Sequence, residues 1–104
     1  MAVQASVTVS GGSIQPVADI RLRGQGNGEV SIKWSLDTDG WTFTSNGIDL
    51  NNSNFQKDGP SNNGKNYTWK RKADGADGST VKYTINVTNG TTTQTLDPSI
   101  INEP

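Results

Sequence analysis

A length of 104 residues is that of one ordinary domain, and the chain contains no cysteine and no histidine. The absence of cysteine excludes disulfide bonds and thiolate chemistry. The absence of histidine excludes catalysis, zinc binding and pH switching that depend on an imidazole. Nine basic and ten acidic residues give a net charge of −1, so no overall field draws the chain toward nucleic acid.

The first residues, MAVQASVTVSGG, have no basic start and no apolar run of signal-peptide length. No stretch approaches the roughly 20 apolar residues that are needed to span a bilayer. We therefore expect a soluble chain that does not insert into membranes. A cleaved leader replaced by Met1 and Ala2 would leave the same sequence, so the compartment stays unassigned.

Apolar and polar residues alternate along most of the chain, from Val3–Val9 near the start to Val81–Val87 near the end. A period of two is typical of half-buried antiparallel strands. No window has the 3.6-residue apolar stripe of a helix, so we expect no substantial helix. The pattern predicts a core made of Val7, Val9, Ile20, Leu22, Val30, Ile32, Trp34, Phe43, Tyr67, Trp69, Tyr83, Ile85 and Val87.

Asn-Gly and Asp-Gly pairs separate the alternating segments, and they supply the positive φ that tight turns need. In VKYTINVTNGTTTQTL, a strong strand meets Asn89-Gly90 and returns through Thr91 to Leu96, which predicts a hairpin. Residues 51–66 have the least ordered composition, with one weak strand around Phe55. The spacing predicts one all-β domain over residues 1–104, an immunoglobulin-like sandwich of seven or eight mostly antiparallel strands without substantial helix.

The segment DTDGW, residues 37–41, allows two interpretations. A helix–loop–helix calcium loop needs oxygen ligands at positions 1, 3 and 5, glycine at 6 and an acid at 12. Counted from Asp37, glycine falls at position 4 and Ile48 at position 12, so that pattern fails. Asp37 and Asp39 could still join another loop acid around a weakly held calcium ion. The preferred interpretation is a hairpin turn between EVSIKWSL and WTFT.

The tryptophans differ in their expected exposure. Trp34 and Trp69 alternate in phase with apolar neighbours, so we expect both in the core. Trp41 begins its strand beside a loop and is the one most expected to be partly exposed. Exposed tryptophans can stack on sugar rings through their apolar faces. Trp41, with loop aspartates and asparagines, is therefore a candidate carbohydrate-binding residue.

The basic run WKRK, residues 69–72, lies beside an aromatic residue. A nucleic-acid surface interleaves bases and aromatics over a broad face, whereas acids follow here at Asp74 and Asp77. We interpret the run as a solvated strand end and expect no nucleic-acid partner. Catalysis also has little to build on, because no histidine can activate a serine and no carboxylate stands in an apolar segment. We therefore expect that the chain is not an enzyme.

The segment GSTVKYTINVTNGTTTQTLDPSI resembles the last two strands of bacterial immunoglobulin-like modules, including the polycystic-kidney-domain and fibronectin type III groups. The ending LDPSIIN, residues 96–102, is similar to the tail of small uncharacterised bacterial proteins with LDPxIxN near the terminus. The antibody-type cysteine pair is missing, so the resemblance is to the disulfide-free branch. It covers about a quarter of the chain, and it carries over no activity and no functional residue.

These observations predict a non-enzymatic module of the protein- or surface-interaction kind, acting through a sheet face or an unpaired edge strand. The partner stays unassigned, and the chain is expected to be a monomer or a weak homodimer. Two alternatives stay open. One is a carbohydrate-binding module that uses Trp41 and polar loop residues, and the other is a structural domain stabilised by calcium at Asp37 and Asp39.

Overall fold

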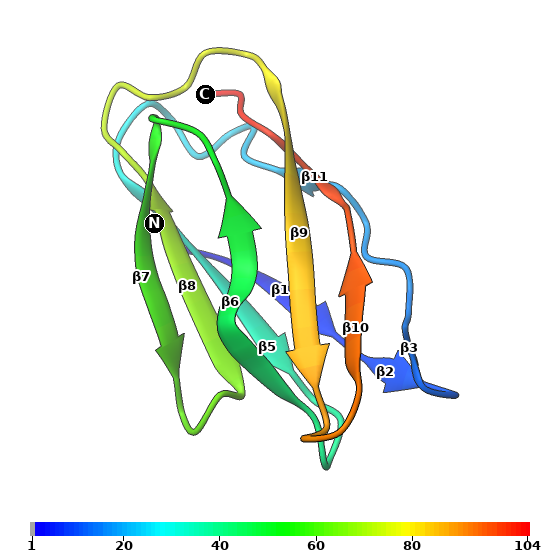
Figure 1. Cartoon of the computed structure of the whole chain (residues 1–104). Helices are drawn as coiled ribbons and strands as arrows, with labels where there is room; N and C mark the ends of the chain where they lie inside the picture. The colour runs from blue at the N-terminus through cyan, green and yellow to red at the C-terminus, as the bar shows by residue number, and fades with distance from the viewer. Residues whose placement is uncertain (1) are drawn as a thin grey trace.

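A computed structural model describes residues 2–104, which form β-strands joined by turns and loops, with no helix (Figure 1). The expected all-β class is therefore confirmed for these residues. No segment among them is a helix long and apolar enough to cross a membrane.

The first sheet has four strands in the order β1–β5–β8–β7. Their bounds are Ala2–Val7 for β1, Val30–Leu36 for β5, Asn66–Arg71 for β8 and Phe55–Ser61 for β7. β1 runs parallel to β5, and the other neighbours are antiparallel. β1 and β7 are therefore the two outer strands of this sheet.

The second sheet is built around β9 (Thr80–Thr88), which pairs with β6 (Thr42–Leu50) along one edge. β10 (Thr93–Leu96) and β11 (Ser99–Ile101) follow each other along the other edge. β4 (Ile20–Arg21) runs parallel to β11. A small ribbon of β2 (Val9–Ser10) and β3 (Ser13–Ile14) connects the two sheets at the start of the chain.

The described residues thus contain eleven strands, whereas the sequence predicts seven or eight. Part of the excess comes from the last strand, where the pairing register with β9 is the same before and after Asp97-Pro98. Proline has no N–H to donate to the ladder, so the strand is interrupted there without changing direction. The predicted hairpin at Asn89-Gly90 is confirmed, since β10 pairs with β9 around it.

The two sheets face each other across an apolar core that is tied by polar contacts of aromatic side chains. Trp34 Nε1 on β5 donates to the Tyr83 hydroxyl on β9 at 3.1 Å, and Trp69 Nε1 on β8 donates to the Ile48 carbonyl on β6 at 2.9 Å. Every residue of the predicted core is buried, Trp34 and Trp69 included. The predicted core did not include these further buried side chains: Ile14, Leu36, Ile48, Leu50, Phe55, Val81 and Ile100.

The predicted hairpin turn at residues 37–40 is wrong in one respect. The segment does form a turn, in which the Trp41 amide donates to the Thr38 carbonyl at 3.4 Å. However, β5 pairs with β1 and β8, while β6 pairs with β9 in the opposite sheet. The turn therefore carries the chain from one sheet to the other. Two alternating strands around a polar turn have the same sequence pattern in both arrangements.

The weak strand expected around Phe55 is a full strand of seven residues. Its pattern is obscured because Lys57, Asp58, Gly59 and Pro60 follow Phe55, and the register shifts between Lys57 and Gly59. Proline and a bulge are tolerated because β7 is an outer strand, with one side free of ladder hydrogen bonds.

Candidate functional site

The outer edge of β1 presents a row of open backbone groups. The Val7 carbonyl accepts a hydrogen bond from the Asp37 amide at 3.1 Å, so residue 7 directs its backbone groups toward β5. Successive residues of a strand point to alternate sides, so Ala2, Gln4 and Ser6 direct their N–H and C=O groups outward. All three of these residues are exposed.

A groove of about 390 Å³ runs beside this edge, between residues 3–6 of β1 and residues 16–21. Val3, Ala5 and Val17 are partly buried hydrophobic residues that pack against the core, and they give the groove its apolar character. The exposed residues Asp19 and Arg21 place one charge of each sign on the second wall. The edge and the groove together suit an extended segment that alternates apolar and polar side chains.

The other long outer strand of this sheet is protected against such pairing, and β1 is not. β7 carries Lys57, Asp58, a bulge before Gly59, and Pro60. Charges, bulges and prolines are the devices by which proteins block edge strands. The β1 sequence, AVQASV, has no charge, glycine or proline, and it pairs with β5 without a register shift. β1 is thus a regular edge with its hydrogen-bonding groups open.

A second candidate site lies at the end of the molecule where three turns meet. A hollow of about 450 Å³ is lined by the turns that follow β5, β7 and β9 and by the adjoining ends of β6 and β9; the lining residues are Gly40, Trp41, Thr42, Asn63, Lys65, Thr88, Asn89 and Gly90. Trp41 is half-buried and packs partly against the core, in agreement with its expected partial exposure. The hollow combines one aromatic side chain with amide and hydroxyl groups.

Lys65 fixes the turn that carries Trp41. Its Nζ donates to the Thr38 carbonyl at 2.6 Å and to the Trp41 carbonyl at 2.9 Å. The neighbouring Gly64 carbonyl accepts from the Phe43 amide at 2.7 Å. The turn after β7 is therefore attached to the turn after β5, and the backbone around Trp41 is held on both sides.

The calcium candidates Asp37 and Asp39 lie at the same crossover turn, and both are exposed. The Asp37 carboxylate accepts from Thr8 Oγ1 at 2.9 and 3.1 Å, and Thr38 Oγ1 accepts from the Val9 amide at 2.9 Å. Within residues 2–104, no three His, Cys, Asp or Glu side chains are grouped so that they could hold a metal ion. Asp37 connects the end of β1 to the crossover turn.

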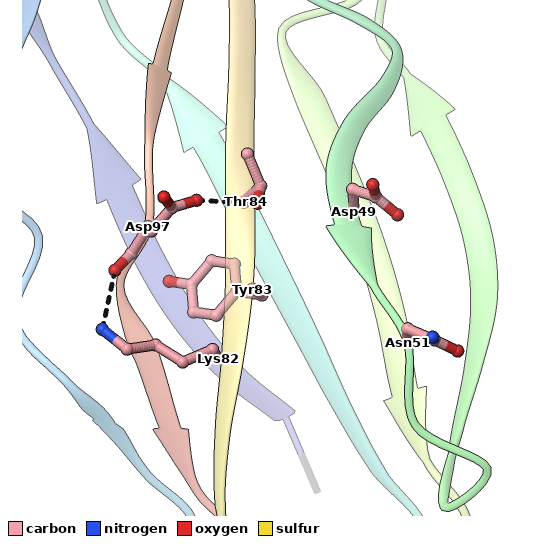
Figure 2. Close-up of a pocket in the computed structure, with 6 residues that line it drawn as sticks. All are labelled: Asp49, Asn51, Lys82, Tyr83, Thr84 and Asp97. Atoms are coloured by element: carbon pink, nitrogen blue, oxygen red, sulfur yellow. Dashed lines mark hydrogen bonds between the residues drawn. The ribbon is translucent and has the colours of Figure 1, made fainter.

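A third hollow, of about 420 Å³, lies where β6, β9 and the interrupted last strand run side by side; it is lined by Asp49, Asn51, Lys82, Tyr83, Thr84 and Asp97 (Figure 2). Thr84 Oγ1 donates to the Asp97 carboxylate at 2.7 Å, and Lys82 Nζ donates to the Asp97 carbonyl at 3.2 Å. These contacts hold the chain where β10 gives way to β11. Burial raises the pKa of Tyr83 to about 12.

The basic run of residues 69–72 is only partly a solvated strand end, because Arg71 is fully buried. It occupies the inward-facing position after Tyr67 and Trp69 on β8. Its Nη2 donates to the carbonyls of Gly26 and Gly28 at 2.7 and 2.9 Å. Burial lowers the pKa of its guanidinium group below the ordinary value. The prediction for Arg71 is wrong, and its phase with Trp69 is the signal that could have corrected it.

Arg71 belongs to a polar network with the end of the chain. Its Nη1 donates to the Glu103 carbonyl at 3.3 Å and to Asn102 Oδ1 at 3.4 Å. The fully buried Asn102 donates through Nδ2 to the Gly75 carbonyl at 2.7 Å and to the Asp77 carboxylate at 3.1 Å. Hydrogen bonds from Ser79, and then from Asn102, lower the pKa of Asp77. The asparagine of LDPSIIN is thus a structural residue that anchors the loop before β9.

Comparison with protein-family models and with curated proteins finds no match for this chain.

Proposed function

We propose that the chain is a non-enzymatic, immunoglobulin-like interaction module that binds an extended partner segment along the outer edge of β1. The observation that carries this proposal is the regular, uncharged edge of β1, whose outward backbone groups lie beside an apolar groove. In strand addition, main-chain hydrogen bonds supply affinity, and alternate side chains supply specificity. The groove beside Val3 and Ala5 would receive the apolar side chains of the added strand.

The strand order supports the immunoglobulin-like assignment. In that fold, strands A, B, E and D form one sheet, and C, F and G form the other. β5, β8 and β7 correspond to B, E and D, while β6, β9 and the joined β10–β11 correspond to C, F and G. β1 departs from this plan because it runs parallel to β5.

Peptides selected from a random phage-displayed library against the full chain test the proposed function. They should carry apolar residues at alternate positions and shift the backbone amide resonances of Gln4 and Ser6. Gln4→Pro removes one outward N–H, which an edge strand tolerates, and should weaken binding at least about tenfold. Gln4→Thr keeps that N–H and is the matched control. Equal binding to both variants, or a library that yields no binder, would contradict the proposal.

A second candidate function is carbohydrate binding at the Trp41 hollow. It is favoured by the gathering of Trp41, Asn63 and Asn89 from three separate turns around one open space. Because Trp34 and Trp69 are buried, a ligand-induced change in fluorescence would come from Trp41. Titration with soluble polysaccharides should change the emission of the wild type and not of Trp41→Phe. Unchanged emission across a panel of polysaccharides would argue against this function.

A further inference from the structure

The open backbone groups of β1 form a pattern that is its own complement. In an antiparallel pair, two opposite residues that point at each other exchange both of their hydrogen bonds. The outward residues Ala2, Gln4 and Ser6 are evenly spaced around Gln4. A two-fold axis at Gln4 therefore places Gln4 opposite Gln4 and Ala2 opposite Ser6.

We propose that the segment bound at this edge is β1 of a second copy of the chain, antiparallel and in that register. The inference rests on the proposed function, because it uses the same edge. It joins the first sheets of two molecules into one continuous sheet. The interface is symmetric, as in most homodimers, so that one surface serves both partners.

The side chains agree with this register. Directly opposite residues of an antiparallel pair lie on the same face of the sheet, so Val3 meets Ala5 of the other copy on the inner face. On the outer face, the two Gln4 amides meet and can hydrogen-bond to each other. Residues 2–7 carry no charge, so the strand does not repel its own copy. Val7 is fully buried and stays outside the pairing.

The second wall of the groove also suits a symmetric partner. Asp19 and Arg21 are exposed and stand two residues apart in the segment that faces β1. A two-fold axis reverses the order of this wall in the second copy, so the two walls present their acid and their base to each other in opposite order. Complementary charge of this kind selects a partner and fixes its register.

The contact is small, which sets its expected strength. The register supplies about six backbone hydrogen bonds and a narrow apolar strip, at the low end of interface sizes. We therefore expect a weak, reversible dimer. Sedimentation should show association of the wild type and of Gln4→Thr as the concentration rises, and Gln4→Pro should stay monomeric.

Disulfide cross-linking tests the register, because the chain has no cysteine of its own. The Cα atoms of a hydrogen-bonded antiparallel pair lie about 5.5 Å apart, within the roughly 4.4–6.8 Å that a disulfide requires. Gln4→Cys should form a disulfide dimer at least about tenfold faster than Thr92→Cys, an exposed control in the loop after β9. Ser6→Cys alone should not, since its partner would lie about 13 Å along the strand. Mixed Ala2→Cys and Ser6→Cys should cross-link to each other.

The contrary results distinguish a wrong register, an absence of self-pairing and an absence of strand addition. A mixed Gln4→Cys and Ser6→Cys dimer without the Gln4→Cys homodimer would overturn the register. Cross-linking no faster than that of the Thr92→Cys control, with a monomer at every concentration, would overturn self-pairing. If selected peptides still shifted Gln4 and Ser6, strand addition would survive with a different partner. If they did not, both proposals would fail.

Discussion

Replacement of Arg71 by methionine tests whether a buried charge without an ion pair stabilises this fold. Among residues 2–104, its guanidinium contacts carbonyl and amide oxygens and forms no ion pair. The two bonds to Gly26 and Gly28 are short, whereas those to Asn102 and Glu103, at 3.4 and 3.3 Å, are longer than is usual for an N–H···O hydrogen bond. Methionine is an unbranched apolar side chain, shorter than arginine, that keeps part of the aliphatic stem and removes every one of these donors.

The size of the effect follows from the two short bonds. A hydrogen bond to a charged group contributes about 1.5–3 kcal/mol, so the two together contribute about 3–6 kcal/mol. The desolvation of the buried guanidinium offsets part of this stabilisation, and methionine has no such desolvation cost. We therefore expect Arg71→Met to lower the free energy of unfolding by about 2–4 kcal/mol. That is a large share of the roughly 5–15 kcal/mol by which a domain is stable.

Urea unfolding followed by tryptophan fluorescence measures the loss. Arg71→Met should lower the midpoint and leave the m-value unchanged, because the same surface is exposed on unfolding. The neighbouring Lys72 is exposed, so Lys72→Met is the matched control and should change stability by less than about 0.5 kcal/mol. If the two variants were equally stable, the view that the buried guanidinium stabilises the loop before β5 and the end of the chain would be wrong.

Three further outcomes are expected. Burial raises the pKa of Tyr83 from 10.0 to about 12, so the stability that the neutral hydroxyl provides is present below pH 10 and is lost as the pH rises to 12. In urea titrations, the free energy of unfolding of the wild type should fall over this range by about 3 kcal/mol relative to that of Tyr83→Phe. A Cβ at Gly47 would lie 2.5 Å from the Phe43 Cβ, so Gly47→Ala should cost about 1–3 kcal/mol in thermal unfolding, whereas Gly28→Ala, where the space is open, should cost little. The pKa of Asp77 is lowered from 3.8 in the folded protein, so the stability that its carboxylate provides is present above pH 3.8 and is lost as the pH falls through the lower folded pKa. Asp77→Asn should remove this part of the loss of stability in acid.

The sequence predicts the core of this fold well, because burial of one face of a strand produces an alternation of apolar and polar residues within the strand itself. Ile32 and Trp34 alternate with exposed or half-buried residues, and Tyr83, Ile85 and Val87 do the same, so period alone identifies their inner face. The terminal hairpin follows from Asn89-Gly90 for the same reason, since turn chemistry is local.

Features that depend on distant parts of the chain were not predictable in this way. The turn at residues 37–40 could join neighbours in one sheet or cross between two, and only the pairing of β6 with β9 decides this. Arg71 has carbonyl partners more than 30 residues away, so its polar type suggested solvent although its phase suggested the core. The open edge of β1 likewise depends on which strands flank it, which the sequence of β1 does not record.

The parallel pairing of β4 with β11 has a consequence for synthesis of the protein. Ile20 lies beside Ile100, and the Leu22 amide donates to the Ile101 carbonyl at 3.0 Å. Because such long-range pairs form late, Ile20 and Leu22 have no sheet neighbour until residue 101 has left the ribosome. Until then, these two apolar side chains lack the strand beside which they lie in the folded protein, and they are open to contacts with other unfinished chains.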